Sequence, residues 1–475
     1  MGIKLDWQVE SEQSHLRATE DPAVVRARQH ARRRLIALLI GLVSVLGLVG
    51  MGIVWRLRSV DDQFRQDLID TVEIEVTALR LGDLPNFMAI QRSASDTFLL
   101  EQSRRFDDYQ ALKQTRRVEL TGEILSVTID DQRGRVIVQE IIDGVPYKVV
   151  WFYWYYEDGD VSDQGGWRHV PDDLTFWGAE REITQDNVRI TYRTLDSALA
   201  QSLAPRLDTW LDEGCTLAGC VDGVPSLHVD IVAERPATVE WATYDAWTLR
   251  VSSPLVGRTR ADTALAPDLA HEVAAQVAAR LVRYAAGNLI LPAASDAAWM
   301  EADLARWLAH QLLGGAAAAP GFTESLIAQY GPGAPLTVVD TLRRGAGTLD
   351  GVISALAGVS MPLLSTDQLN ALRWVEFFQW RLALEPDLLA QSDGGAFVSL
   401  YDQDNPFAAG EAAARLQNAD YAARPVPQIT SVSISRDAES QTYAYAETTR
   451  LENGVTVPGD TIIWRLTGGT WKRLN

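Results

Sequence analysis

The sequence is poor in cysteine, histidine and basic charge. Among its 475 residues are two Cys and six His, and 43 Lys and Arg stand against 63 Asp and Glu, which gives a formal net charge of -20. Nucleic acids and anionic lipid surfaces are negatively charged themselves, so an acidic protein of this kind is a poor match for either. We therefore predict no nucleic-acid partner.

The two cysteines, Cys215 and Cys220, are close neighbours in the segment GCTLAGCVDG. The turn-rich residues between them allow the sulfurs to meet and to close a small loop between a helix and a strand. A metal site built on both thiolates is the alternative, but a second pair of ligands is lacking. We predict a disulfide, because this part of the chain is expected outside the cytoplasm, where disulfides persist.

The sequence contains a long apolar run at residues 35–55 (LIALLIGLVSVLGLVGMGIVW), and this run has no charge. As a helix it measures about 32 Å, which matches a bilayer hydrocarbon core of about 30 Å. A cleaved signal peptide is the rival interpretation. It is disfavoured because the run is long and continues into WRLR without a small-x-small cleavage site. We predict a retained transmembrane helix whose partner is the lipid bilayer.

The distribution of arginine predicts the orientation of this helix. Arginine is concentrated before the run, at positions 26, 28, 32, 33 and 34, and only Arg56, Arg58 and Arg65 follow closely behind it. By the positive-inside rule, residues 1–34 form a cytoplasmic tail, and its polar residues 1–25 are expected to be disordered. Residues beyond about 56 are predicted to be extracytoplasmic at the cell membrane.

The remaining chain, about 420 residues, is long enough for two or three domains. It begins with helical patterns at 60–81, 87–91 and 96–109, with Gly82 as a stop signal. From residue 118 the apolar period changes to two, which predicts antiparallel strands at 118–130, 135–142 and 147–156. The aromatic run at 151–156 either lines a ligand pocket or fills the core, and core filling is the favoured interpretation.

The same order of elements recurs at the other end of the chain. Helices are predicted at 369–389 and 405–417, and strands at 427–436, 441–450, 460–466 and 470–474. Alignment of the two ends pairs Phe87 with Phe397 and Trp167 with Trp471. This pattern predicts an internal repeat.

Both ends resemble the cone-shaped nuclear transport factor 2-like or SnoaL-like fold, in which helices lie inside a strongly curved sheet. In enzymes of that kind the mouth of the cone often carries an Asp, His or Tyr acid-base group. His169 is the only histidine of the first copy and the second copy has none, so no acid-base dyad is assigned. The resemblance therefore implies a binding role or a rigid spacer more than an enzyme.

The middle of the chain has strand patterns at 187–193, 226–232 and 247–252 and a helix at 196–213. Two long helices follow at 267–284 and 295–313, and then an array of helices broken at glycines. This order of elements resembles that of the gluzincin, or peptidase MA-like, metallopeptidases. The segments that carry the resemblance are the one around Trp299, LIAQYG and LRRGAGTLDGVISALAGVS.

The zinc site of such peptidases needs His-Glu-x-x-His on one helix and a Glu on the next. His271 and Glu272 occupy the first two positions, but Ala275 replaces the second histidine and Ala302 the glutamate. Glu301 and Asp303 flank position 302 and point to either side of it. One ligand of three cannot hold zinc. We therefore predict no metal and no cofactor, and we interpret His271 and Glu272 as vestiges.

The predicted fold class is α+β, with a single N-terminal transmembrane helix, a cone-like α+β domain, a zincin-like α/β plus helical domain and a second cone-like α+β domain. The predicted boundaries are 1–34, 35–55, 56–182, 183–364 and 365–475. We predict a non-catalytic, pseudopeptidase-like binding or assembly module at the cell envelope, with an unknown protein or envelope ligand as partner. The alternative is a membrane-anchored hydrolase or metallopeptidase with displaced or unrecognised catalytic residues.

Overall fold

The computed structural model describes residues 22–157, 165–236, 238–315, 321–345, 347–418, 420–452 and 455–475. The described chain is a mixed α+β structure, as the sequence predicts. It divides into two compact units. Unit 1 contains Met1–Asp143 and Trp151–Asp172, and unit 2 contains Gly144–Val150 and Asp173–Asn475.

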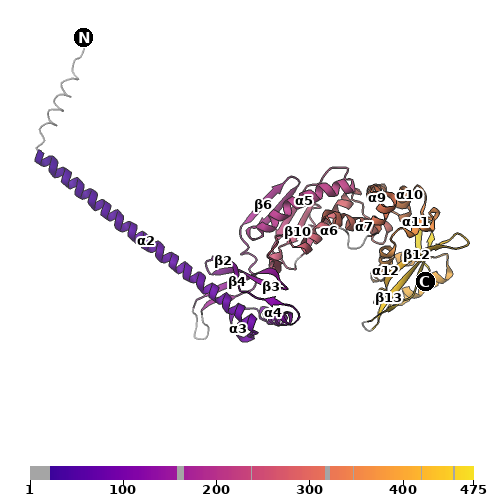
Figure 1. Ribbon diagram of the computed structural model, residues 1–475, viewed down its shortest axis with the longest axis horizontal. Helices are drawn as coiled ribbons and strands as arrows, with labels where there is room; N and C mark the ends of the chain where they lie inside the picture. The colour runs from indigo at the N-terminus through magenta and orange to yellow at the C-terminus, as the bar shows by residue number, and fades with distance from the viewer. Residues whose placement is uncertain are drawn as a thin grey trace, which may run out of the picture. The chain divides into compact units, whose positions relative to one another are not determined.

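The first helix, α2 (Pro22–Leu81), is unbroken over 60 residues (Figure 1). Its apolar segment has exposed side chains, among them Leu38 at 74 % and Met51 at 71 %. Of the helices in the described ranges, α2 is the one long and apolar enough to span a membrane. The predicted span and the predicted helix at 60–81 are therefore one element. Residues 22–25 are also helical, which corrects the expected disorder there, whereas residues 1–21 lie outside the described chain.

The second half of α2 is amphipathic. Leu68, Val72, Val76 and Leu79 recur at helical spacing and are buried. The helix ends at Leu81 because Gly82 adopts a left-handed conformation with φ 76°. The same helix thus presents apolar side chains all round in one part and a single apolar stripe in the next.

Unit 1 continues with two helices and a set of antiparallel strands. Strand β3 pairs with β1 and β2, and the second half of β4 pairs with β5. The predicted strand over 118–130 is split in two, with Gly122 at φ 72° between its parts. The elements are α3 (Leu84–Ile90), α4 (Asp96–Thr115), β1 (Val118–Glu119), β2 (Ile124–Asp130), β3 (Arg133–Ile142), β4 (Val145–Tyr156) and β5 (Gly166–His169).

The aromatic run of β4 fills the core of unit 1. Trp151, Phe152 and Tyr153 are 5 %, 1 % and 0 % exposed, whereas Trp154 is 46 % exposed. Close packing extends to the backbone, since a Cβ on Gly134 would lie 2.8 Å from the Leu68 side chain. The favoured interpretation of this run as core filling agrees with these exposures.

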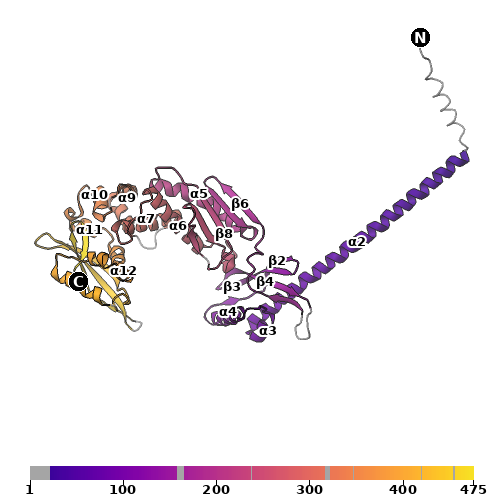
Figure 2. The ribbon, with the colours of Figure 1, turned by 180° about the vertical axis from the view of Figure 1, so that it is seen from behind.

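Unit 2 begins with a five-stranded sheet in the order β6-β7-β8-β10-β9. The inner pairs β7–β8 and β8–β10 are parallel, and the outer pairs are antiparallel. Helix α5 (Ser197–Ala218) provides the crossover from β7 to β8 and lies along one face of the sheet (Figures 1 and 2). The strands are β6 (Glu180–Gln185), β7 (Val188–Arg193), β8 (Leu227–Val232), β9 (Val239–Trp241) and β10 (Thr248–Ser252).

A helical array follows this sheet. Before it, the short strand β11 (Arg258–Arg260) pairs with residues 147–149 of β4. Proline at the first position starts α6, and the side chain of Ser295 caps α7 through the amide of Ala298 at 3.2 Å. The helices are α6 (Pro267–Ala285), α7 (Asp296–Leu312), α8 (Phe322–Tyr330), α9 (Ala334–Arg343) and α10 (Leu349–Ala357).

The C-terminal part has four helices and then an antiparallel sheet in the order β12-β13-β15-β16, with β14 on β13. The predicted helix at 369–389 is broken, because the Asn370 side chain bonds both backbone groups of Ile434 in β12. The elements are α11 (Thr366–Asn370), α12 (Val375–Ala390), α13 (Gly394–Ser399), α14 (Pro406–Gln417), β12 (Gln428–Arg436), β13 (Thr442–Glu452), β14 (Val455–Pro458), β15 (Ile462–Thr467) and β16 (Thr470–Arg473).

One hydrophobic core extends through unit 2 from Val188 to Trp471. The predicted boundary at 364/365 falls inside this unit, and unit 1 ends at Asp172, before the predicted boundary at 182. The short strands β6, β9, β11 and β14 were not predicted. They are edge or terminal pairings with little apolar alternation, so tertiary pairing alone defines them.

The first repeat (residues 61–172) and the second repeat (residues 369–475) share a set of contacts. Phe87 and Phe397, the pair aligned in sequence, are 2 % and 0 % exposed. Trp167 and Trp471 are each 1 % exposed, and each packs against an aromatic ring of the preceding long helix, Phe64 and Phe378 respectively. The sequence alignment therefore joins residues with the same environment.

The backbone pairing at the end of each repeat is also the same. Gln91 forms a parallel bridge with His169, and Tyr401 forms one with Arg473. In both repeats the residue after the bridge donates its amide to the carbonyl of the last strand, at 2.8 Å and 3.0 Å. A helix, a short helix and the last strand thus meet in the same way twice.

Cys215 and Cys220 form a disulfide, with Cα atoms 4.9 Å apart. Helix α5 extends past the predicted end at 213. Cys215 therefore lies in the last turns of the helix and not in a loop after it. Gly219 caps the helix in a left-handed conformation, φ 73°, and brings Cys220 back beside it. The bridge therefore fixes the C-terminal end of α5.

We expect the bridge to be closed in protein isolated without reductant. Alkylation of the denatured, non-reduced chain should then label neither cysteine. Replacing both by serine should lower the free energy of unfolding by about 2 kcal/mol or less, because the closed loop is short. Mass spectrometry and urea unfolding measure the two quantities, and two labelled thiols in protein isolated without reductant would contradict the bridge.

Candidate functional site

A carboxylate lies on the buried face of α2. Glu75 is 1 % exposed and belongs to the stripe that contains Val72, Val76 and Leu79. A carboxylate without partners is strongly destabilising in such surroundings. The position is therefore tenable only because other side chains bond to it.

Three side chains surround Glu75. His169 Nδ1 lies 2.7 Å from Glu75 Oε1, and the Tyr153 hydroxyl donates to Oε2 at 2.8 Å. Gln91 Nε2 donates to Oε1 at 3.1 Å. The partners come from β5, from the paired position of β4, and from the residue after α3. We call these four residues the Glu75 cluster.

The surroundings set the protonation of the cluster. Burial acts to raise the pKa of Glu75, but the charge and hydrogen bond of His169, with those from Tyr153 and Gln91, outweigh it and hold the pKa below its ordinary value of 4.5. Burial and the negative charge of Glu75 raise the pKa of Tyr153 well above 10.0. Glu75 is therefore the charged acceptor and Tyr153 the neutral donor.

The second repeat has a buried glutamate at the corresponding position. Glu385 precedes Phe397 by the same number of residues as Glu75 precedes Phe87. Arg473 bonds Glu385 Oε1 at 2.5 Å. The hydroxyls of Tyr401 and Tyr421 donate to Oε2 at 3.0 Å and 2.7 Å. We call Glu385, Tyr401, Tyr421 and Arg473 the Glu385 cluster.

The two clusters differ in chemistry. Burial opposes the charge of Arg473, but the pairing with Glu385 and the neighbouring tyrosines raises the pKa of Arg473 above its ordinary value. Burial raises the pKa of Tyr401 as well, although the charge of Arg473 acts against it. The Glu385 cluster is thus built on an arginine–carboxylate ion pair, whereas the Glu75 cluster is built on a histidine–carboxylate pair.

Aromatic rings lie near His169, and several buried polar atoms of the first repeat have no hydrogen-bond partner. The Trp151 ring is 5.7 Å and the Phe98 ring 6.3 Å from its imidazole, centroid to centroid. Trp151 Nε1, Gln91 Oε1 and Gln102 Oε1 are buried without a hydrogen-bond partner in the structure. The first repeat therefore combines a histidine–carboxylate pair with unused donors and acceptors.

The sequence pattern indicated His169 but not Glu75, and so no acid-base dyad was predicted. The structure brings the two within hydrogen-bonding distance across 94 residues of chain. A signal was available: a glutamate interrupts an apolar helical stripe, and Glu385 repeats it at the same distance before a phenylalanine. An acidic residue repeated on two apolar faces indicates a buried pair.

The structure does not bring the parts of the predicted zinc motif together. His271 and Glu272 lie on the exposed face of α6. The His271 ring is 5.8 Å from the His310 ring, centroid to centroid, near the far end of α7. Glu301, beside position 302, instead pairs with Arg283, about 18 Å along α6 from His271 at the helical rise.

The carboxylates of α7 have structural partners. Asp303 accepts from the backbone amide and hydroxyl of Thr323 at 2.9 Å and 2.6 Å. Glu301 bonds Arg283 at 3.0 Å. Among the described residues, no group of three or more His, Cys, Asp or Glu side chains is arranged to hold a metal ion. These carboxylates join α7 to α6 and α8.

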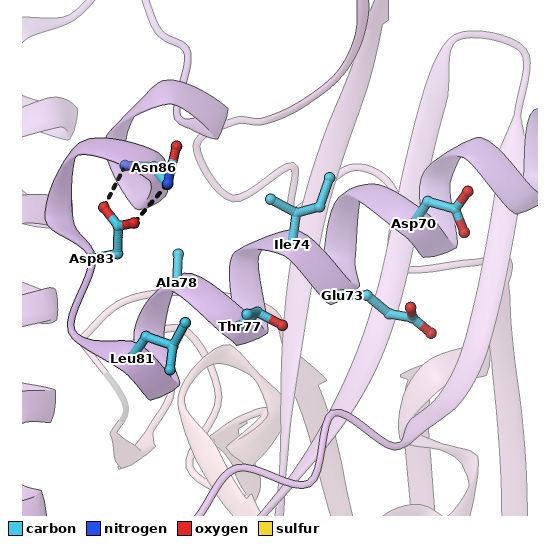
Figure 3. A pocket seen from close by; sticks show the side chains of 8 residues that line it. All are labelled: Asp70, Glu73, Ile74, Thr77, Ala78, Leu81, Asp83 and Asn86. Atoms are coloured by element: carbon cyan, nitrogen blue, oxygen red, sulfur yellow. Dashed lines mark hydrogen bonds between the residues drawn. The ribbon is translucent and has the colours of Figure 1, made fainter.

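A groove opens on the exposed face of α2, where the helix meets α3 (Figure 3). Its volume is about 450 Å³. Ile74 and Leu81 are 56 % and 75 % exposed, and Asp83 accepts from the amide and side chain of Asn86 at 3.2 Å and 2.6 Å. We call it the α2 groove, and its lining is Asp70, Glu73, Ile74, Thr77, Ala78, Leu81, Asp83 and Asn86.

The α2 groove is apolar and acidic. Three of its eight lining residues are acidic and none is basic. The neighbouring cations are engaged elsewhere: Arg80 donates to the carbonyl of Leu120 at 2.8 Å, and Lys113 to that of Arg80 at 2.8 Å. The groove thus combines exposed aliphatic side chains with negative charge.

Comparison with known proteins gives no match: no protein-family model, no curated protein and no solved structure matches this chain. The features of the structure that bear on function are the two clusters, the groove and the long helix.

Replacing Glu75 by Gln should weaken the first repeat. Loss of the charge leaves His169 without its anion, and breaking a buried pair in this way costs about 3–5 kcal/mol. Since the folded pKa of Glu75 is lowered, the contribution is fully present above its ordinary value of 4.5 and is lost as the pH falls through the folded pKa. The difference between wild type and variant should therefore shrink on acidification.

Hydrogen–deuterium exchange of residues 84–92 and 166–170 in the full chain measures this difference. Glu73→Gln is the matched control, because Glu73 lies two residues earlier on the same helix and is exposed, and its effect should stay within about 0.5 kcal/mol. Equal exchange in wild type and Glu75→Gln at neutral pH would contradict the pairing.

Proposed function

We propose that this protein is a single-pass membrane protein that holds a binding or assembly module outside the cytoplasm, at the cell envelope. The observation that carries the proposal is the continuity of α2. Its apolar segment is exposed as a membrane anchor would be, and the buried stripe that begins at Leu68 lies on the same helix. At the helical rise the core of unit 1 begins about 20 Å beyond Trp55.

Two independent features support the orientation. Arginine is concentrated before the apolar segment, which favours a cytoplasmic N-terminus. The disulfide of α5 lies on the other side of that segment, and disulfides persist outside the reducing cytoplasm. Both support an extracytoplasmic location for the residues after 55.

We further propose that the two repeats are cone-like, nuclear transport factor 2-like or SnoaL-like domains, and that the segment between them is a degenerate, zincin-like domain. The shared buried glutamates, bridges and ring contacts support a common fold for the repeats. The outward orientation of His271 and Glu272, and their distance from position 302, support a segment without zinc chemistry.

A binding role fits the surfaces better than catalysis. Each cluster joins a long helix, the residues after a short helix and the last strand, so its polar groups are used in holding the fold together. The open acidic groove, in contrast, presents aliphatic side chains to solvent. Exposed apolar groups in a hollow favour a protein partner.

The alternative is a membrane-anchored hydrolase with catalytic residues other than the vestigial motif. One observation favours it: Glu75 and His169 form a hydrogen-bonded pair, and Gln91 of the same cluster has a buried Oε1 without a hydrogen-bond partner. An imidazole oriented by a carboxylate is a common general base. In this alternative the chemistry belongs to the first repeat rather than to α6.

A measurement of membrane topology tests the proposed location. A reporter fused after Asn475 should be active only where extracytoplasmic reporters are active, because the arginine excess keeps the N-terminus inside. The control is a chain in which arginines 32, 33 and 34 are exchanged for Asp and three arginines are added after Trp55, which should invert the signal. A cytoplasmic reporter signal from the natural chain would overturn the proposed location.

Metal content and substitution separate the two candidate functions. The purified full chain should contain no stoichiometric zinc by elemental analysis, and His271→Ala should leave its thermal unfolding unchanged, since the side chain is exposed. Stoichiometric zinc with proteolysis that Glu272→Gln abolishes would instead support a peptidase. Hydrolysis that survives His271→Ala but not His169→Gln would support acid-base chemistry in the first repeat.

A further inference from the structure

The face of α2 that carries the groove has a counterpart in the second repeat. When Glu75 is aligned with Glu385, Asp70 corresponds to Trp380 and Ile74 to Leu384. The two alignments already made, of the glutamates and of Phe87 with Phe397, fix the same register. The same face of the first long helix can therefore be compared, residue by residue, between the two repeats.

In the second repeat this face is a docking surface for a helix. The Trp299 ring of α7 lies 4.9 Å from that of Phe377 and 6.2 Å from that of Trp380 on α12, centroid to centroid. Asp296 of α7 lies 3.5 Å from Arg381. The N-terminal part of α7 thus packs on α12 through aromatic rings and an ion pair.

The residues that pack on α12 also bury side chains further along this helix. Leu384 and Leu388 are 8 % and 5 % exposed, and Ala294, just before α7, packs against their cluster. Their counterparts in the first repeat are Ile74, which is 56 % exposed, and Ala78, which is 3 % exposed and lines the groove. The contrast therefore lies at one position, where Leu384 is covered and Ile74 is open.

We infer that the α2 groove docks a basic, amphipathic helix of another protein, in the manner in which α12 docks α7. This inference rests on the proposed binding role and specifies the partner. Where α12 presents Phe377 and Trp380, α2 presents Asp67 and Asp70. The exposed aliphatic side chains remain, so the partner helix has apolar residues on one face flanked by Lys or Arg.

Charge and distance distinguish between the possible occupants of the α2 groove. A second copy of the same face would place Asp70, Glu73 and Asp83 against identical carboxylates, and like charges repel. The chain's own arginines before the anchor lie on the same straight helix, about 55 Å from Asp70 at the helical rise, and cannot fold back onto it. A basic helix from another protein meets neither obstacle.

Peptide binding to the full chain in a neutral detergent tests the groove itself. The probe is a synthetic, fluorescent amphipathic helix of Leu, Ala and Lys. The controls are a scrambled peptide of the same composition and a version with Glu in place of Lys. We expect anisotropy to report binding of the probe, weakened at least tenfold by Asp70→Lys with Glu73→Lys and by Ile74→Asp.

Matched variants separate docking from net charge. Asp107→Lys with Asp108→Lys makes the same charge change on the exposed face of α4, and Leu100→Asp makes the same polar change at a 54 % exposed site. Both should alter affinity less than twofold. Equal loss in the groove and control variants, or equal binding of the scrambled peptide, would overturn the inference.

Photo-crosslinking in cells identifies the occupant. A photoreactive residue at position 74 should give an adduct with a different protein, and the same residue at position 100 should not. An adduct of twice the chain mass would make the occupant a second copy and overturn the inference, as would equal adducts at 74 and 100. The peptide measurement needs no membrane orientation, so its outcome is separate from that of the topology reporter.

Discussion

The fold of each repeat depends on one buried carboxylate. A glutamate on the apolar face of a long helix has to find partners at the moment the helix packs, because an unpaired charge there is far costlier than the packing is favourable. In the first repeat the partners are His169, Tyr153 and Gln91, and in the second the cluster is built around Arg473. Each glutamate therefore determines which strand end and which short helix lie beside the long helix.

The two repeats keep this arrangement and differ in what it is made of. A histidine bonds the glutamate in one repeat and a permanently charged arginine bonds it in the other. The outer face of the long helix differs too: α12 is covered by α7 through Trp299, whereas α2 leaves Ile74 exposed between carboxylates. The second repeat belongs to unit 2, and the long helix of the first carries both an exposed apolar segment and an open groove.

The middle segment illustrates how motif positions acquire meaning only in three dimensions. In sequence, His271 and the Trp299 helix stand in the order of a zinc peptidase. In the structure, α6 buries Val273, Ala274 and Val277 and turns His271 and Glu272 outward, while α7 uses Glu301 and Asp303 to hold its neighbours. The buried glutamates Glu75 and Glu385 lie instead in the two repeats, outside this motif.

The sequence by itself determined the features that arise from local pattern. The uncharged run before Arg56, the helical and alternating periods, Gly82 as a helix end and the proximity of Cys215 and Cys220 all depend on residues close in the chain. Helical and strand periods, caps and short loops are set by backbone geometry, which neighbouring residues fix. The mixed α+β class followed from them.

Only the tertiary structure decided the rest. The union of anchor and first-repeat helix, the break after Asn370 and the edge strands depend on contacts from distant segments. The pairing of Glu75 with His169 spans 94 residues, and a charged residue on an apolar stripe does not reveal which distant group neutralises it. The sequence also did not reveal that the α2 groove is exposed and that α12 is covered. The same amphipathic pattern fits both outcomes, and only the packing of the whole chain decides between them.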